Sequence, residues 1–476
     1  MGYGIGFCFG SETVRLGGFN LAVNRSNQIL IIVMIASFLT PFCGSSLNMS
    51  LPDIGREFHA GTSELSWVIE TFLLTCAIFT VPMGQLGNRI GKKKVFLIGT
   101  ILFTLSSLVI HFAPTIHWLM VLRGLQGIAA AMLFSTGTAI IALVFPPERR
   151  GWAMGMNVAV VYIGLAVGPV IGGFLNYRFG WQSIFYFIAF LGMIATIMTI
   201  LFMKEDWVNK EQGYMNPISI LLYAASLVMG LYGLSEIVKL PVAKYIFGAG
   251  IVTTIIYVWH EARVAKPLLP VRIFLENKTF AFSNLASMLN YSATFAIGFL
   301  LSLYLQMIMG YDSEAAGWFL LVQSIVMAAL SPVMGSLSDR YGSAVLASTG
   351  MGVIAVGLLV MWTAMNLSST GLIITALIIV GVGFAMFSAP NNNAIMGSVP
   401  PAYFGMASSV ISTVRLLGQV LSMAIVASIL ARNTGAAGTA IANVDKTVLL
   451  ANIQYSLMVF MAFCIVGIIP SMIRNK

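Results

Sequence analysis

Two charged side chains lie inside long apolar segments, where an ionised group is costly. Of the 16 acidic residues only Glu70 lies clearly within such a segment, and Arg123 lies about six residues inside another. If both segments are helices that enter a membrane from the same side, each residue is roughly 8 to 9 Å deep. A carboxyl group at this depth changes its charge when its surroundings alternate between water and protein. We therefore predict that Glu70 and Arg123 form an ion pair that couples to proton binding; the alternative for Glu70 is a structural hydrogen bond.

Other reactive residue types form no recognisable site. The four histidines and four cysteines are dispersed, without the clustering that a metal ion or a catalytic group needs. A nucleotide-binding loop requires G-x-x-x-x-G-K-[ST], and Gly91-Lys92 fails this pattern because Leu86 and Lys93 occupy two required positions. The sequence thus predicts no enzyme activity, no cofactor and no metal site.

The composition indicates an all-α polytopic membrane protein. Only 9% of the residues are charged and the mean hydropathy is +0.92, whereas roughly a quarter of the residues are charged in soluble proteins. The net charge of +9 does not indicate nucleic-acid binding, because basic clusters beside apolar segments are also what orients a membrane protein. We therefore expect the chain to lie in a lipid bilayer and to bind no nucleic acid.

Apolar runs long enough to cross a bilayer predict fourteen helices, arranged as six, two and six. The expected spans are 27–49, 65–86, 95–113, 117–144, 152–175, 182–203, 217–237, 243–260, 280–308, 315–337, 344–364, 370–390, 405–431 and 447–470. This gives an N-terminal bundle at 27–203, two inserted helices with their linkers at 204–279, and a C-terminal bundle at 280–470. Residues 1–26 and 471–476 are expected to be cytoplasmic tails.

The distribution of Lys and Arg predicts the orientation. With the N-terminus placed inside, 17 of the 25 basic residues fall on the inner side and 6 on the outer side. An even number of spans then puts both termini in the cytoplasm, in a protein of the cell membrane.

One loop pattern occurs twice, 251 residues apart, each time between two apolar spans. The first copy is Gly84-Gln85-Leu86-Gly87-Asn88-Arg89-Ile90-Gly91, and the second is Gly335-Ser336-Leu337-Ser338-Asp339-Arg340-Tyr341-Gly342. Glycine permits close approach of helices, and the basic residues fix the loop on the inner side. One copy alone would be a plain charged turn, but two equivalent copies predict an internal duplication with a gating element that includes Gly84, Asn88, Arg89, Gly91, Asp339 and Arg340.

A glycine pattern in the fifth span predicts tight helix packing. Gly164, Gly168, Pro169, Gly172 and Gly173 form the pattern G-x-x-x-G-P-x-x-G-G, which places small residues on one helix face, while proline removes a backbone donor and bends the helix. Packing without a role in transport is the alternative interpretation.

Polar residues within the spans are candidates for the lining of a cavity. Arg415 lies about ten residues into the thirteenth span, with Gln419 one turn further on the same face. Hydrogen bonding between helices is the alternative for the neutral members of this set. The predicted substrate cavity comprises Cys43, Asn48, Gln126, Asn290, Gln306, Arg415 and Gln419.

These patterns together resemble the major facilitator superfamily. Residues 84–94 are similar to its motif A, Arg123 to Gly127 to motif B (R-x-x-Q-G), and Gly164 to Gly173 to the antiporter motif C, which is associated with export. Fourteen spans resemble the branch of drug/proton antiporters. Two positions depart from that branch, because Cys43 stands where its first-helix acid is expected and Asn88 replaces the motif A aspartate.

The resemblance implies a monomeric secondary exporter of small hydrophobic or amphipathic compounds, driven by proton antiport with alternating access. The missing acid weakens the case for cationic substrates and for proton coupling. The alternatives are a proton-independent facilitator or uptake symporter for a small metabolite, and a sensor or lipid-handling member of the same fold.

Overall fold

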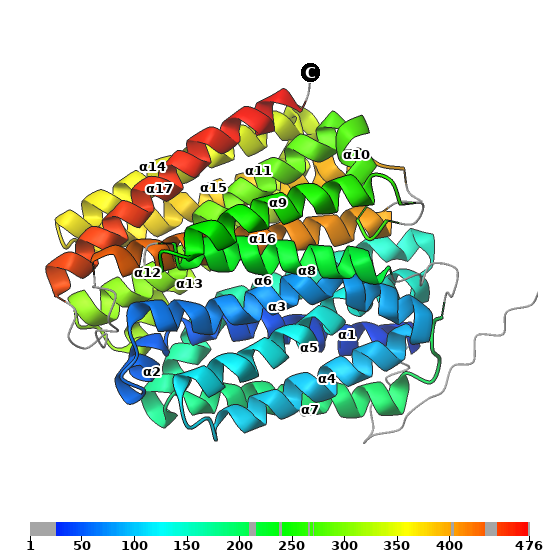
Figure 1. Ribbon diagram of the computed structural model, residues 1–476, viewed down its shortest axis with the longest axis horizontal. Helices are drawn as coiled ribbons and strands as arrows, with labels where there is room; N and C mark the ends of the chain where they lie inside the picture. The colour runs from blue at the N-terminus through cyan, green and yellow to red at the C-terminus, as the bar shows by residue number, and fades with distance from the viewer. Residues whose placement is uncertain are drawn as a thin grey trace, which may run out of the picture.

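The computed structural model describes residues 25–208, 216–237, 240–264, 267–269, 271–400, 404–433 and 445–474. Within these ranges all the regular secondary structure is helical (Figure 1). Most of the expected N-terminal tail, at 1–24, and the last two residues of the expected C-terminal tail lie outside the described residues. Helix is the expected outcome in lipid, because every backbone polar group must be satisfied within the segment itself.

The first set of long helices follows the expected order. The set consists of α1 (Arg25–Leu47), α3 (Thr62–Ile90), α4 (Lys92–Ile110), α5 (Ile116–Val144), α6 (Pro147–Phe179) and α7 (Gln182–Phe202). A short helix, α2 (Leu51–Glu57), connects α1 to α3. The helices α8 (Pro217–Ser235) and α9 (Ala243–Glu261) come next, followed by the short α10 (Val271–Glu276).

The second set begins with a broken helix. It runs as α11 (Lys278–Thr294), α12 (Ile297–Leu303) and the π-helical segment η1 (Tyr304–Ile308). The long helices that follow are α13 (Ser313–Tyr341), α14 (Ser343–Asn366), α15 (Thr370–Gly397), α16 (Phe404–Asn433) and α17 (Lys446–Ile473).

Thirteen helices among the described residues are long and apolar enough to cross a membrane. The predicted span 243–260 forms α9, which is outside this set of thirteen and carries Lys244 near its start and Glu261 at its end. The multi-pass membrane architecture is therefore confirmed, and the count of fourteen spans stays a prediction.

The two sets of helices repeat the same packing. In the first set α3 and α4 pack on α5, and α1 packs on α6 and α7; in the second set α13 and α14 pack on α15, and α11 packs on α16 and α17. Contacts between the sets are also reciprocal, because α3 packs on α16 and α13 packs on α6. Figure 1 shows the first set in blue to blue-green on one side and the second in light green to red on the other. The internal duplication seen in the loops thus extends to whole bundles.

The inserted pair lies at the junction between the two bundles. Helix α9 packs on α8, and α8 contacts both α3 and α16. The hydroxyl of Tyr223 in α8 donates to the carbonyl oxygen of Ala77 at 3.1 Å, and Ser428 in α16 donates to the carbonyl oxygen of Leu234 at 2.6 Å. One face of α8 therefore ties the second helix of the N-terminal bundle to the fifth helix of the C-terminal bundle.

Candidate functional site

A cavity of about 180 Å³ lies between the two bundles. Its walls come from equivalent helices of both sets: α1, α3, α5 and α6 on one side, and α11, α13, α15 and α16 on the other. Because the first, second, fourth and fifth helices of each bundle meet here, a relative rotation of the bundles would change access to this space.

Three of the predicted cavity residues line this space. They are Asn48 at the end of α1, and Arg415 and Gln419 on successive turns of α16. The guanidinium of Arg415 reaches across the cavity to within 5.8 Å of the Phe134 ring centre in the other bundle, and it interacts with Tyr291. The sequence therefore identified the charged group that faces the cavity.

Arg123 does not face the cavity but lies fully buried inside the N-terminal bundle. Its NH1 donates to Gln126 Oε1 at 2.8 Å and lies 2.9 Å from the sulfur of Cys43, and its Nε donates to the carbonyl oxygen of Val68 at 3.2 Å. Its charge also sits 4.2 Å from the ring centre of Phe72. Neutral acceptors and a π-face thus take the place of a carboxylate.

The predicted ion pair between Glu70 and Arg123 is not formed. Glu70 is 1% exposed and accepts hydrogen bonds from the hydroxyl of Ser235 in α8, at 3.1 and 3.4 Å to its two oxygens. Next to it, Trp67 Nε1 donates to Glu236 Oε1 at 2.7 Å. The shared depth of Glu70 and Arg123 was a poor guide to pairing, because depth along a helix does not specify which face a side chain occupies.

Four predicted cavity residues lie elsewhere. Cys43 and Gln126 belong to the buried contacts of Arg123, as described above. Asn290 is fully buried in α11, and neither its side-chain oxygen nor its nitrogen has a hydrogen-bond partner. Gln306 lies at the end of the broken helix, where its Nε2 donates to the carbonyl oxygen of Met49 at 3.2 Å. Interhelical contacts, which were the alternative for neutral polar residues, account for Gln306 and for Gln126, whose Nε2 donates to the hydroxyl of Ser107 in α4 at 2.8 Å.

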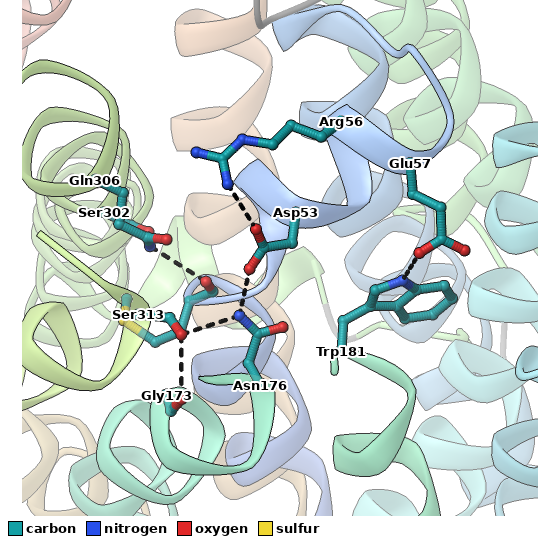
Figure 2. Close-up of polar contacts among 10 residues, drawn as sticks. Asp53, Arg56, Glu57, Gly173, Asn176, Trp181, Ser302, Gln306 and Ser313 are labelled. Carbon is teal, nitrogen blue, oxygen red and sulfur yellow. Dashed lines mark hydrogen bonds and ion pairs between the residues drawn. The ribbon is translucent and has the colours of Figure 1, made fainter. Parts of the chain in front are cut away.

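The two bundles are joined at the end that contains α2 (Figure 2). Asn176 Nδ2 donates to Asp53 at 2.5 Å and to the hydroxyl of Ser313 at 3.0 Å, and that hydroxyl donates to the carbonyl oxygen of Gly173 at 3.1 Å. Arg56 pairs with the other oxygen of Asp53 at 2.9 Å. The cavity is thus closed at this end by polar contacts between α2, α6 and the start of α13.

A second layer of contacts supports this closure. Ser302 donates to the carbonyl oxygen of Asn48 at 2.6 Å, and it accepts from Gln306 at 2.8 Å. Nearby, Trp181 Nε1 donates to Glu57 at 2.7 Å, which fixes α2 on its own bundle (Figure 2). The carbonyl oxygens of Asn48 and Met49, which accept from Ser302 and Gln306, belong to the turn between α1 and α2. This turn therefore holds the end of the broken first helix of the second bundle.

The glycine pattern in α6 packs against two different helices. Added Cβ atoms at Gly164, Gly168 and Gly172 would collide with α1, whereas a Cβ at Gly173 would collide with the backbone of Ser313 in α13. Pro169 lines the cavity, and its carbonyl oxygen touches Gly317 of α13. The pattern therefore brings α6 into close contact with α1 of its own bundle through three glycines, and with α13 of the other bundle through Pro169 and Gly173.

The duplicated loop forms the same turn in both copies. Gly91 has φ of +117° and Gly342 has φ of +85°, and each ends one long helix and begins the next. Such values favour glycine. In the first copy Asn88 accepts a hydrogen bond from Lys92 Nζ at 2.6 Å. A lysine thus contacts the amide that stands in for the motif A aspartate.

The remaining members of the predicted gating element lie at the same helix ends. Gly84 faces α5, where an added Cβ would lie 3.5 Å from Ser135. Arg89 and Arg340 are exposed, and the side chain of Asp339 is outside the described residues. The carboxylate of Asp206, in the segment after α7, occupies the space beside Gly91 and accepts from the backbone N–H of Lys93 at 3.0 Å.

Sequence reasoning missed several residues of the site. Tyr162 and Ser388 bridge the bundles through their hydroxyl groups at 2.9 Å, within the same region as the cavity. Asp53, Asn176 and Ser313 were not singled out either. A usable signal existed for α13, because Ser313 and Gly317 are four residues apart and form a small-x-x-x-small pair.

Comparison with known proteins identifies the family. Residues 33–423 match the model of the Major Facilitator Superfamily, so this chain belongs to that superfamily of membrane transporters. The riboflavin transporter RibZ of Clostridioides difficile strain 630 is 29% identical over 405 residues, which cover 85% of this chain and 88% of RibZ. The multidrug resistance protein Stp of Mycobacterium tuberculosis H37Rv is 28% identical over 421 residues, which cover 86% and 77% of the two chains.

Solved structures share the fold. A bacterial homologue of the human lysosomal transporter Spinster, in an inward-facing and unoccupied conformation, has a TM-score of 0.69 at 14% identity and covers 95% of this chain and 97% of its own. The human organic anion transporter MFSD10 has a TM-score of 0.64 at 13% identity, with 94% and 99% covered. These similarities confirm the predicted major facilitator fold.

Proposed function

We propose that this protein is a secondary active exporter of small hydrophobic or amphipathic compounds, of the fourteen-helix drug/proton antiporter type. The observation that carries this proposal is the cavity between two equivalent bundles, lined mostly by apolar side chains and closed at one end by hydrogen bonds between the bundles. Motif C in α6 and the kinship with the multidrug resistance protein Stp support export over uptake. The runner-up is a proton-independent facilitator or an uptake symporter for a small metabolite, which the kinship with the riboflavin transporter RibZ favours.

We propose that α2 lies at the outer side and both termini lie in the cytoplasm, as the distribution of basic residues predicts. The conformation described above is then closed to the outside. One chain supplies both bundles and hence a complete alternating-access path, so we propose that the protein works as a monomer in the cell membrane.

We propose Glu70 as the proton-carrying group. It is almost fully buried at the junction of α3 and α8, close to the contacts of α8 with α16 of the other bundle. A carboxyl group in this position would change its environment when the bundles move, and such a change shifts the balance between its charged and neutral forms. Arg123, with Cys43 and Gln126, then has the separate role of holding α1, α3 and α5 together.

Reconstitution into liposomes tests direction and coupling together. Vesicles loaded with riboflavin, an aromatic anion or an aromatic cation are exposed to an acidic outer medium, with protein-free vesicles as the control for passive leakage. A proton antiporter in the proposed orientation expels its substrate faster under this gradient. Substrate flux that is independent of the pH gradient supports the facilitator. Substrate accumulation inside the vesicles, driven by the pH gradient, supports the symporter.

The role of Glu70 is tested with Glu70→Gln. We expect this variant to lose proton-driven export while it still exchanges unlabelled for labelled substrate, because the cavity is intact. Glu261→Gln is the matched control, since Glu261 is an equally buried acid whose carboxylate accepts from the backbone N–H of Leu269 at 3.0 Å. Proton-driven export by Glu70→Gln at the normal rate would remove Glu70 from the coupling step.

A further inference from the structure

The charge of the cavity wall is unbalanced. Among the described residues that line the cavity, Arg415 is the one charged side chain, and none is Asp, Glu, Lys or His. Its neighbours are apolar, or neutral hydrogen-bonding groups such as Gln419, Gln323 and Ser324. The wall therefore carries a formal charge of one positive unit.

No counter-ion for Arg415 is present on the described part of the chain. The ion pairs found there are Arg25 with Glu205 and Arg56 with Asp53, both away from the cavity. A neighbouring phenol, Tyr291, is neutral under ordinary conditions. A cation within a protein is costly unless it is paired. Arg415 thus contrasts with Arg123, whose hydrogen bonds to Gln126 and Val68 are made inside the bundle.

The position of Arg415 allows a ligand to supply the missing charge. The residue lies in the middle of α16, it is only partly buried, and its guanidinium points across the space between the bundles towards Phe134. A planar guanidinium can bind both oxygens of a carboxylate, sulfonate or phosphate at once. Its field at the same time repels an organic cation, and a partly buried charge is screened less than one in bulk salt solution.

Aromatic side chains indicate that the preferred ligand contains a ring system in addition to an acidic group. Six rings line the cavity, and they come from both bundles: Phe72, Phe134, Tyr162, Tyr291, Phe295 and Phe384. Aromatic walls of this kind favour flat, apolar ring systems through stacking and edge contacts. A molecule that combines a ring system with one acidic group would satisfy the rings and the guanidinium together.

We propose that the cavity selects aromatic anions, with Arg415 as the residue that determines this specificity, and that aromatic cations of the same size are poor ligands. This inference rests on the proposed function of the cavity as the substrate site. It makes the protein an exporter of acidic aromatic compounds, in which the substrate brings the counter-charge that the wall lacks.

The test is equilibrium binding of three radiolabelled probes that share one ring system and differ in charge: 2-naphthoate, 2-naphthylmethanol and 2-naphthylmethylammonium. Purified wild-type protein should bind the anion about 10- to 100-fold more tightly than the cation, the range expected for a hydrogen bond to a charged group. Arg415→Gln should abolish this preference, and Arg415→Lys should preserve its sign. Arg178→Gln is the matched control, because Arg178 is exposed at the end of α6, outside the cavity.

If Arg415→Gln still binds the neutral alcohol, the variant is folded. The comparison of the three probes on wild-type protein tests the inference even if the variant fails to fold. Equal or tighter binding of the cation to wild-type protein would overturn the inference, and so would an anion preference that survives Arg415→Gln. Failure of the export proposal has a different signature: anions bind with the expected preference, but no probe crosses the liposome membrane.

Discussion

Replacing Gly317 by alanine should open the closed end of the molecule. Gly317 lies one turn into α13, where it touches the backbone of α6 in the other bundle. An added Cβ would lie 2.9 Å from the carbonyl carbon of Pro169 and 3.2 Å from the Cα of Val170, and closer still to the carbonyl oxygen of Pro169. Ordinary contact begins at 3.4 Å, so the carbonyl carbon alone requires the backbones to separate by 0.5 Å, and the closer carbonyl oxygen requires a larger separation.

The cost of this separation can be estimated. Overpacking a tight contact costs about 1 to 3 kcal/mol, which corresponds to a shift of about 5- to 150-fold in a two-state equilibrium. The higher helix propensity of alanine does not alter this shift, because residue 317 is helical whichever end of the cavity is open. Gly317→Ala should therefore favour the conformation in which α6 and α13 are apart at this end.

Distances between spin labels measure the effect. Labels on Phe179→Cys and Leu367→Cys report on the two bundles at this end, because both side chains are about 70% exposed and belong to different bundles. A Cys8→Ser background suffices, since the other three cysteines are buried. The variant should populate longer distances than the parent protein.

Gly371→Ala is the matched control, because an added Cβ at Gly371 meets nothing within 4 Å. Identical distance distributions for Gly317→Ala and Gly371→Ala would refute the idea that backbone contact between α6 and α13 holds this end closed.

Three further predictions concern the buried arginine, the duplicated loop and a helix terminus. Gln126→Leu removes an acceptor from Arg123 and should destabilise the protein by about 1.5 to 3 kcal/mol, seen as a lower melting temperature in detergent; an unchanged value would contradict it. Arg89→Ala should slow transport about 2- to 30-fold, the range for coupling energies of 0.5 to 2 kcal/mol, at unchanged substrate affinity; normal turnover would exclude a gating role. Hydrogen bonds from Thr447 lower the pKa of the Asp445 carboxyl below its ordinary 3.8, so this cap stabilises α17 at neutral pH and should be lost as the pH falls through the lowered pKa. Hydrogen exchange in the first turn of α17 checks this, and protection that persists at low pH would contradict it.

Much of the fold was predictable because a bilayer imposes simple constraints. A segment that crosses it must be apolar, helical and about 20 residues long, so the helices could be located from composition alone. The paired loops ending at Gly91 and Gly342 also predicted the repeated packing of the two bundles, since equivalent sequences fold into equivalent units. The short helix α2 was less predictable, because it is too short to show a clear period.

The positions of the site residues were predicted only in part, because the sequence does not specify the rotation of each helix about its own axis. Arg415 and Gln419 line the cavity, where a mid-span charge needs either water or a partner, and their role in substrate binding stays a prediction. Glu70 and Arg123 have similar depths, yet one faces α8 and the other faces α1. Sequence spacing defines which residues share a face of one helix, but it does not define which neighbour that face meets.

By itself, the sequence determined the membrane class, the duplication and the presence of an arginine that needs a counter-charge. These follow from the cost of placing polar groups in lipid, which acts on each segment independently. The tertiary structure decided which arginine makes its hydrogen bonds within a bundle and which faces the cavity. It also revealed the contacts of Asp53, Asn176 and Ser313 that close one end. Those outcomes depend on the relative rotation and approach of helices far apart in the chain, and only the packed bundles specify them.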